Sequence, residues 1–119
     1  MTRRSLAPPA IWAILILTLS SIPNVPSLGP SGTDKLAHFV LYFVLGALCA
    51  PLVIEAEGRS FRGLAVLAAM LLFASLDEAH QLLVRGRDAS LADWMADLLG
   101  AGLGLSLAAI VNSKKRATR

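Results

Sequence analysis

The sequence is poor in charge and has a single cysteine. Only 16% of its residues are charged and 55% are hydrophobic, with a mean hydropathy of +0.65, whereas soluble domains are roughly 25% charged. This composition excludes a disordered chain and disfavours an ordinary soluble domain. Cys49 alone excludes an intrachain disulfide. At 119 residues there is room for one domain, so we expect a single-domain membrane protein.

Several catalytic signatures are also missing. The sequence has no Gly-rich phosphate loop, no G-x-S-x-G elbow and no nucleotide-binding fingerprint. It also lacks H-E-x-x-H or any other strong metal-ligand motif. No cofactor is therefore indicated, and any active site has to be found from scattered polar residues.

Four apolar segments are long enough to cross a bilayer, which takes about 20 residues. They cover residues 6–22, 34–54, 62–84 and 91–111. Ser90, followed by Asp93 three residues later, is typical of a helix start. Gly100 and Gly104 belong to a row of small residues that favours close packing of the last helix. We predict an all-α, four-helix transmembrane bundle that occupies residues 1–119 as one domain.

The basic residues that flank the segments predict their orientation. With four spans, one side receives Arg3, Arg4, Arg59, Arg62, Lys114, Lys115, Arg116 and Arg119. Because such residues favour the cytoplasmic side, both the N and C termini are expected in the cytoplasm, in a multi-pass protein of the inner membrane. The net charge of +3 then reports orientation, and no nucleic-acid partner is expected.

Arg3-Arg4 before an apolar stretch also resembles a secretory or twin-arginine signal. No A-x-A cleavage site follows, so we expect the segment to be retained as a helix.

Most of the remaining charged residues gather toward the outer side, where three helical stripes of polar residues are found. The stripes are Asp34, His38 and Tyr42; Asp77, Gln81 and Arg85; and Ser90, Asp93 and Asp97. Each stripe has the spacing of one helix face. Ionisable groups within a bilayer face a bundle interior or a wet cavity and find partners there. We therefore expect the three stripes to converge near the outer leaflet.

Two interpretations of this cluster remain open. In the structural one, Arg87 and Lys35 neutralise Asp93, Asp77 or Glu78 and hold the helices in register. The chain is then a non-enzymatic membrane binding or assembly module. Ion conduction is less favoured, because the inner half of the spans has no acidic residue.

In the functional interpretation the cluster is a catalytic site. Of the adjacent Asp77 and Glu78, one can serve as a general acid or base. His38 can shuttle a proton if Asp34 orients it, and Arg87 can hold an anionic head group. The catalytic candidates are Asp34, His38, Asp77, Glu78, Arg87 and Asp93. The binding and supporting candidates are Lys35, Tyr42, Gln81, Arg85, Ser90 and Asp97.

The same residues include metal ligands, because carboxylates and imidazole bind divalent cations. The ligand candidates are Asp34, His38, Asp77, Glu78, Asp93 and Asp97. Without a ligand motif, the sequence favours a metal-free network of ion pairs, and no residue is assigned to a metal.

The spacing of these residues resembles that of a known family. The patterns are Asp34-Lys35-x-x-His38-x-x-x-Tyr42, then Asp77-Glu78-x-x-Gln81, then Gly86-Arg87-x-x-Ser90-x-x-Asp93-x-x-x-Asp97-x-x-Gly100. Within a core region of residues 34–104, they resemble the VanZ-like family of small bacterial membrane proteins. Arg85 stands where the family pattern usually has proline, and Asp97 where it usually has asparagine.

The resemblance implies a role at the cell envelope. The family's namesake is associated with resistance to the glycopeptide antibiotic teicoplanin. For this chain it implies a site at the outer leaflet that acts on cell-envelope lipid or wall-precursor material. The implied partners are membrane lipid and a lipid-linked envelope substrate.

Overall fold

The computed structural model is built from four α-helices. It describes residues 5–25, 29, 32–54 and 59–119. The helices are α1 (Ala7–Ser20), α2 (Thr33–Ile54), α3 (Arg59–Gln81) and α4 (Leu91–Ala117). The described residues include no β-strand. The predicted all-α class is confirmed.

Three of the helices are long and apolar enough to cross a membrane. These are α2, residues 60–81 of α3, and α4. α1 is apolar but has only 14 residues, or about 21 Å, against a hydrocarbon core about 30 Å thick. The expected first span, residues 6–22, is thus a shorter helix. It ends early because Pro23 disfavours helical backbone at Ile22 and Asn24 has a positive φ of 49°.

The other helix boundaries differ from expectation by a few residues. α3 begins at Arg59 and ends at Gln81, whereas the expected span covered residues 62–84. Residues 82–84 form tight turns instead, with Val84 N donating to the carbonyl of Gln81 (3.1 Å). α4 begins at Leu91 as expected and continues to Ala117, beyond the apolar segment.

Glycines allow α2 and α4 to pack against each other at backbone distance. A Cβ added to Gly100 would clash with the carbonyl oxygen of Phe39, and one added to Gly104 with that of Phe43. On the facing helix, a Cβ at Gly46 would clash with the carbonyl oxygen of Ala101. The predicted close packing through Gly100 and Gly104 is therefore confirmed within a single chain.

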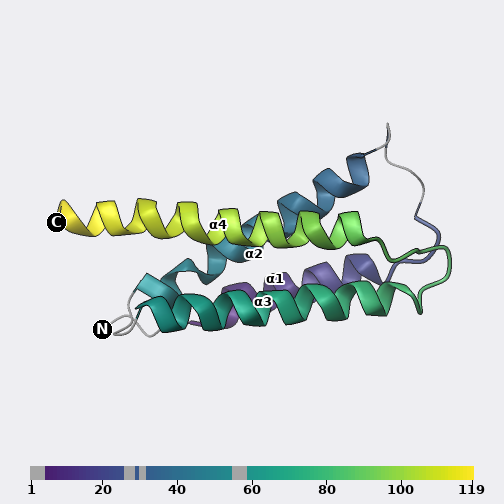
Figure 1. Ribbon diagram of the computed structural model, residues 1–119, viewed down its shortest axis with the longest axis horizontal. Coiled ribbons are helices and arrows are strands. Elements are labelled where there is room, and N and C mark those ends of the chain that lie inside the picture. The colour runs from purple at the N-terminus through teal and green to yellow at the C-terminus, as the bar shows by residue number, and fades with distance from the viewer. Residues whose placement is uncertain (1–4, 26–28, 30–31, 55–58) are drawn as a thin grey trace.

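The helix ends meet at one end of the bundle, which we call the cavity end. There α1 and α3 end and α2 and α4 begin, while the C-terminus of α4 lies at the opposite end (Figure 1). Asn24 N donates to the carbonyl of Arg85 (3.0 Å), which joins the segment after α1 to the α3–α4 loop. This arrangement brings the polar stripes of α2, α3 and α4 to the same end.

The outside of the bundle is apolar. Large side chains are exposed on every helix, including Ile11 on α1, Leu36 on α2, Leu72 on α3 and Leu103 on α4. In a soluble protein such surfaces mark interfaces or liabilities. Here they form the surface that a membrane protein presents to lipid tails.

Candidate functional site

A cavity of about 690 Å³ opens at the cavity end. We call it the polar cavity. Ile16, Leu19 and Leu41 form an apolar wall, and Lys35 and His38 belong to its polar side. Its further polar lining residues are Ser20, Thr33, Asp34, Asp77, Gln81, Arg87, Asp88, Ser90 and Asp93. The volume of the cavity is within the range of ligand sites, and its lining combines an apolar wall with many polar groups.

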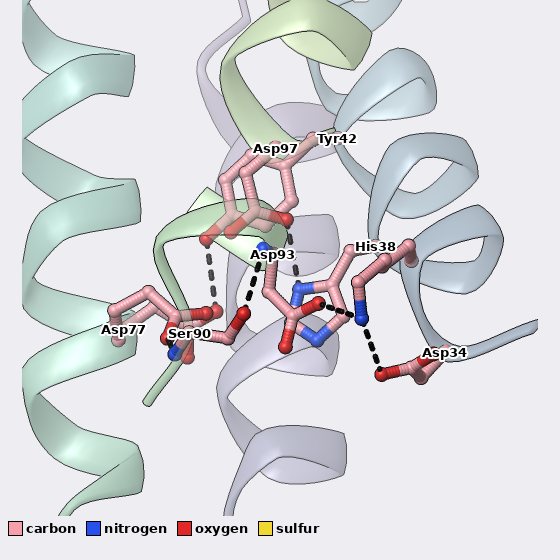
Figure 2. Close-up of polar contacts among 9 residues, drawn as sticks. Asp34, His38, Tyr42, Asp77, Ser90, Asp93 and Asp97 are labelled. Carbon is pink, nitrogen blue, oxygen red and sulfur yellow. Dashed lines mark hydrogen bonds and ion pairs between the residues drawn. The ribbon is translucent and has the colours of Figure 1, made fainter. Parts of the chain in front are cut away.

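Two polar contacts join α2 to α4 beside the cavity (Figure 2). Lys35 Nζ lies 3.4 Å from Asp93 Oδ1 and 3.2 Å from Asp34 Oδ2. His38 Nδ1 lies 2.8 Å from Asp97 Oδ1. If Nδ1 carries the proton and donates to this carboxylate, the ring is fixed with Nε2 available on its other side.

A third contact joins α2 to α3. The hydroxyl of Tyr42 donates to Asp77 Oδ2 (2.9 Å). Tyr42 is 1% exposed and Asp77 is completely buried, while the tyrosine ring packs against Phe73. The third helix of the expected constellation is thus connected to the other two.

Glu78 connects the end of α3 to the start of α4. Its Oε2 accepts a hydrogen bond from Ser90 N (3.0 Å), and Ser90 Oγ accepts one from Asp93 N (3.4 Å). The predicted role of Ser90 at the start of α4 is confirmed.

Several buried polar atoms at this end have no hydrogen-bond partner. They are Asp77 Oδ1, Glu78 Oε1, Gln81 Nε2 and Asp97 Oδ2. Each such atom costs about 1–3 kcal/mol, and more when charged. A water molecule, an ion or a polar group of a ligand that bonds to these atoms would offset that cost.

Arg87 does not form the expected ion pair with Asp93, Asp77 or Glu78. Its Nε donates to the carbonyl of Ile22 (3.1 Å) and its Nη2 to that of Leu19 (3.0 Å). The last carbonyls of a helix lack partners within the helix. The guanidinium donates to one carbonyl in the last turn of α1, that of Leu19, and to one just beyond it, that of Ile22.

Asp34 does not orient His38 as expected. Its side chain is 61% exposed and pairs with Lys35, while Asp97 holds the imidazole. Arg85 is exposed and contributes its backbone carbonyl to the loop contact with Asn24. Both therefore lie at the margin of the site.

The structure brings His38, Glu78 and Asp93 together from three helices. One ligand-type atom from each lies within 4.8 Å of the other two. The cavity also uses α1, which sequence reasoning left out: Ile16 and the buried Ser20 line it. Little in the sequence predicts that α1 lines the cavity, because Ser20 is a small polar residue near the end of an apolar segment.

These features define a small helical membrane protein with an internal polar cavity at one end. The chain belongs to the VanZ/LLP1 family, whose model matches residues 4–112. The VanZ-like resemblance of the motifs is thus confirmed. No curated protein and no solved structure matched the chain.

Proposed function

We propose that this VanZ-like membrane protein resides in the bacterial inner membrane and acts on a lipid or lipid-linked wall precursor. The substrate enters the polar cavity from the outer leaflet. The observation that carries the proposal is the cavity itself, which joins an apolar wall on α1 and α2 to two cations, Lys35 and Arg87, and to the buried acids Asp77 and Asp93. An amphiphile with an anionic head group matches both parts.

The cations at the cavity can bind that head group. The Lys35 side chain is 44% exposed and retains a donor beyond its two carboxylate contacts. Arg87 uses Nε and Nη2 on α1, so Nη1 remains for a phosphate or carboxylate oxygen. Both residues line the cavity.

The reactive groups of the proposal are His38 and Asp93, which line the cavity, and Glu78, which lies next to them. A histidine fixed by a carboxylate is suited to proton transfer, and Asp97 supplies that carboxylate. Glu78 has one oxygen fixed by Ser90 and the other without a partner. This set suits hydrolysis or transfer at a phosphate or acyl group of the bound lipid.

Comparison of lipid and wall-precursor extracts tests the function. Cells with and without the protein should differ in one head-group-bearing species. His38→Asn and Glu78→Gln should abolish that difference at normal membrane abundance. His80→Asn should preserve it, because the His80 imidazole contacts Ser21 and is not one of the three reactive groups. Identical extracts from cells with and without the protein would refute the proposal.

A second candidate is the non-enzymatic assembly module. It is favoured by one observation: three polar contacts join different helices. Lys35–Asp93 and His38–Asp97 join α2 to α4, and Tyr42–Asp77 joins α2 to α3. The contacts therefore hold the bundle together whatever else they do.

Exchanging the charges of one pair separates the two candidates. Lys35→Asp and Asp93→Lys should each lower the thermal stability of the purified protein, and the double variant should restore it if the ion pair serves packing alone. In that case the lipid and wall-precursor extracts of cells with the double variant should also match those of cells with the wild type. A double variant that is stable but leaves the extracts as in cells without the protein would contradict the assembly role and support the catalytic one.

A further inference from the structure

We propose that His38, Glu78 and Asp93 form a binding site for a divalent metal ion of the zinc class. This inference rests on the proposed function, since it names the chemistry of the same cavity. It differs from the metal-free network that the sequence favours. The basis is the convergence of one imidazole and two carboxylates from α2, α3 and α4 at a single point.

The separations require the three ligands to move toward an ion. Ligand atoms about 2.1 Å from one tetrahedral ion are about 3.4 Å apart. The three atoms lie within 4.8 Å of one another, so binding would bring them closer together by up to about 1.4 Å. Three protein ligands leave a fourth position for water or a substrate oxygen, as in catalytic zinc sites.

An unpartnered buried atom points independently to a cation. Glu78 is 7% exposed, its Oε2 is fixed by Ser90 N, and its Oε1 has no partner. The carboxylate is thus held in place with one oxygen left over. A metal ion satisfies that oxygen without requiring another donor from the protein.

The outer contacts of the ligands match those of metal sites. Metal-binding histidines commonly donate their second ring nitrogen to a carboxylate, which fixes the ring and its tautomer. Asp97 Oδ1 occupies that place, 2.8 Å from His38 Nδ1. With Nδ1 held by Asp97, as Figure 2 shows, Nε2 is the ring nitrogen that remains for an ion.

The charge balance favours a cation as well. Asp77, Glu78, Asp93 and Asp97 are all at least nine-tenths buried. Within the described part of the chain, one lysine or arginine side chain forms an ion pair with these carboxylates: Lys35 Nζ lies within 4.0 Å of Asp93. Buried carboxylates without compensation are costly. A divalent ion offsets that cost. The mixed nitrogen and oxygen set favours zinc over calcium or magnesium, which prefer oxygen alone.

Direct metal binding tests the inference. Purified protein in lipid nanodiscs is stripped with a chelator, dialysed against Zn²⁺ and analysed for bound metal. We expect one equivalent per chain for the wild type and for the control His80→Asn. His38→Asn and Glu78→Gln should weaken binding at least tenfold. Absence of stoichiometric Zn²⁺ in the wild type, or equal affinity in all four proteins, would overturn the proposal.

Two further measurements test the site even if one of the variants above fails to fold. The wild type should take up Co²⁺ with a visible absorption band that Zn²⁺ removes, and absence of this band would overturn the site. Asp97→Asn keeps an acceptor for His38, whereas Asp97→Ala removes it. As a positioning residue, Asp97 should give graded losses, reaching about 10–100-fold in the alanine variant.

The metal assay needs no substrate, so its outcome is separate from that of the lipid extracts. If the protein binds stoichiometric Zn²⁺ but cells with and without it give the same extracts, the metal site is supported and the proposed envelope function is refuted. Changed extracts without Zn²⁺ would overturn the metal site and leave proton transfer by His38 and Glu78 as the chemistry.

Discussion

Tyr42 stabilises the contact between α2 and α3 through a single hydroxyl. Its hydrogen bond to Asp77 Oδ2 is buried, and the other oxygen of that carboxylate has no partner. Tyr42→Phe should therefore lower the free energy of unfolding by about 1–3 kcal/mol, because it leaves a second buried acceptor unsatisfied. Thermal unfolding in detergent measures this change.

An exposed hydroxyl provides the control for Tyr42. Ser106 Oγ donates to the carbonyl of Gly102 within its own helix and is exposed. Ser106→Ala should change stability by less than about 0.5 kcal/mol. Equal effects of the two substitutions would show that the Tyr42 hydroxyl contributes nothing specific.

Arg87 should determine whether the end of α1 is held in place. Arg87→Lys keeps the charge but cannot reproduce two parallel donors to Leu19 and Ile22. We expect faster hydrogen exchange in residues 19–25, with the rest of the bundle unchanged. Arg85→Lys is the control, because its contact with Asn24 uses the backbone carbonyl. Unchanged exchange in the Arg87 variant would contradict this role.

The helical periodicity of the sequence predicted which polar residues share a helix face, but it did not predict their partners on other helices. The i, i+4 spacing correctly placed Asp34, His38 and Tyr42 along one helix, and it suggested Asp34 as the partner of His38. The structure instead pairs His38 with Asp97, 59 residues away. That contact depends on how closely α2 and α4 pack, which spacing within one helix does not determine.

At the scale of helices, Gly104 limits the distance between α2 and α4. A methyl group there would clash with the carbonyl of Phe43, whereas one at Gly102 would meet nothing within 4 Å. We expect Gly104→Ala to destabilise the protein by about 1–3 kcal/mol through overpacking. Gly102→Ala should be neutral or stabilise by up to about 1 kcal/mol. Thermal unfolding compares the two, and equal midpoints would contradict the close contact.

Helix ends were predictable where a local signal exists. Ser90 and the apolar run after it gave the start of α4 correctly. The end of α3 was placed three residues too late, because Leu82, Leu83 and Val84 continue the apolar pattern while forming turns. α1 was expected to be longer because hydropathy extends to Ile22, although the backbone leaves the helix before Pro23.

For the whole molecule, charge asymmetry predicts that the cavity end faces outward. Asp88 lies at this end, and Thr118 follows α4 at the other. In a Cys49→Ala background, Asp88→Cys should react with an impermeant maleimide on intact cells. Thr118→Cys should react only after permeabilisation. The reverse pattern would place the C-terminus outside and contradict the positive-inside prediction.

The attachment of α1 has a consequence for biosynthesis. α1 is synthesised before α3 and α4, yet the segment after it contacts Arg87, which is 65 residues from Ile22, and the carbonyl of Arg85. At about 21 Å α1 is also too short to span the hydrocarbon core alone. These contacts at the end of α1 therefore form only after the α3–α4 loop has been synthesised, and the polar cavity is complete only once α4 supplies Ser90 and Asp93.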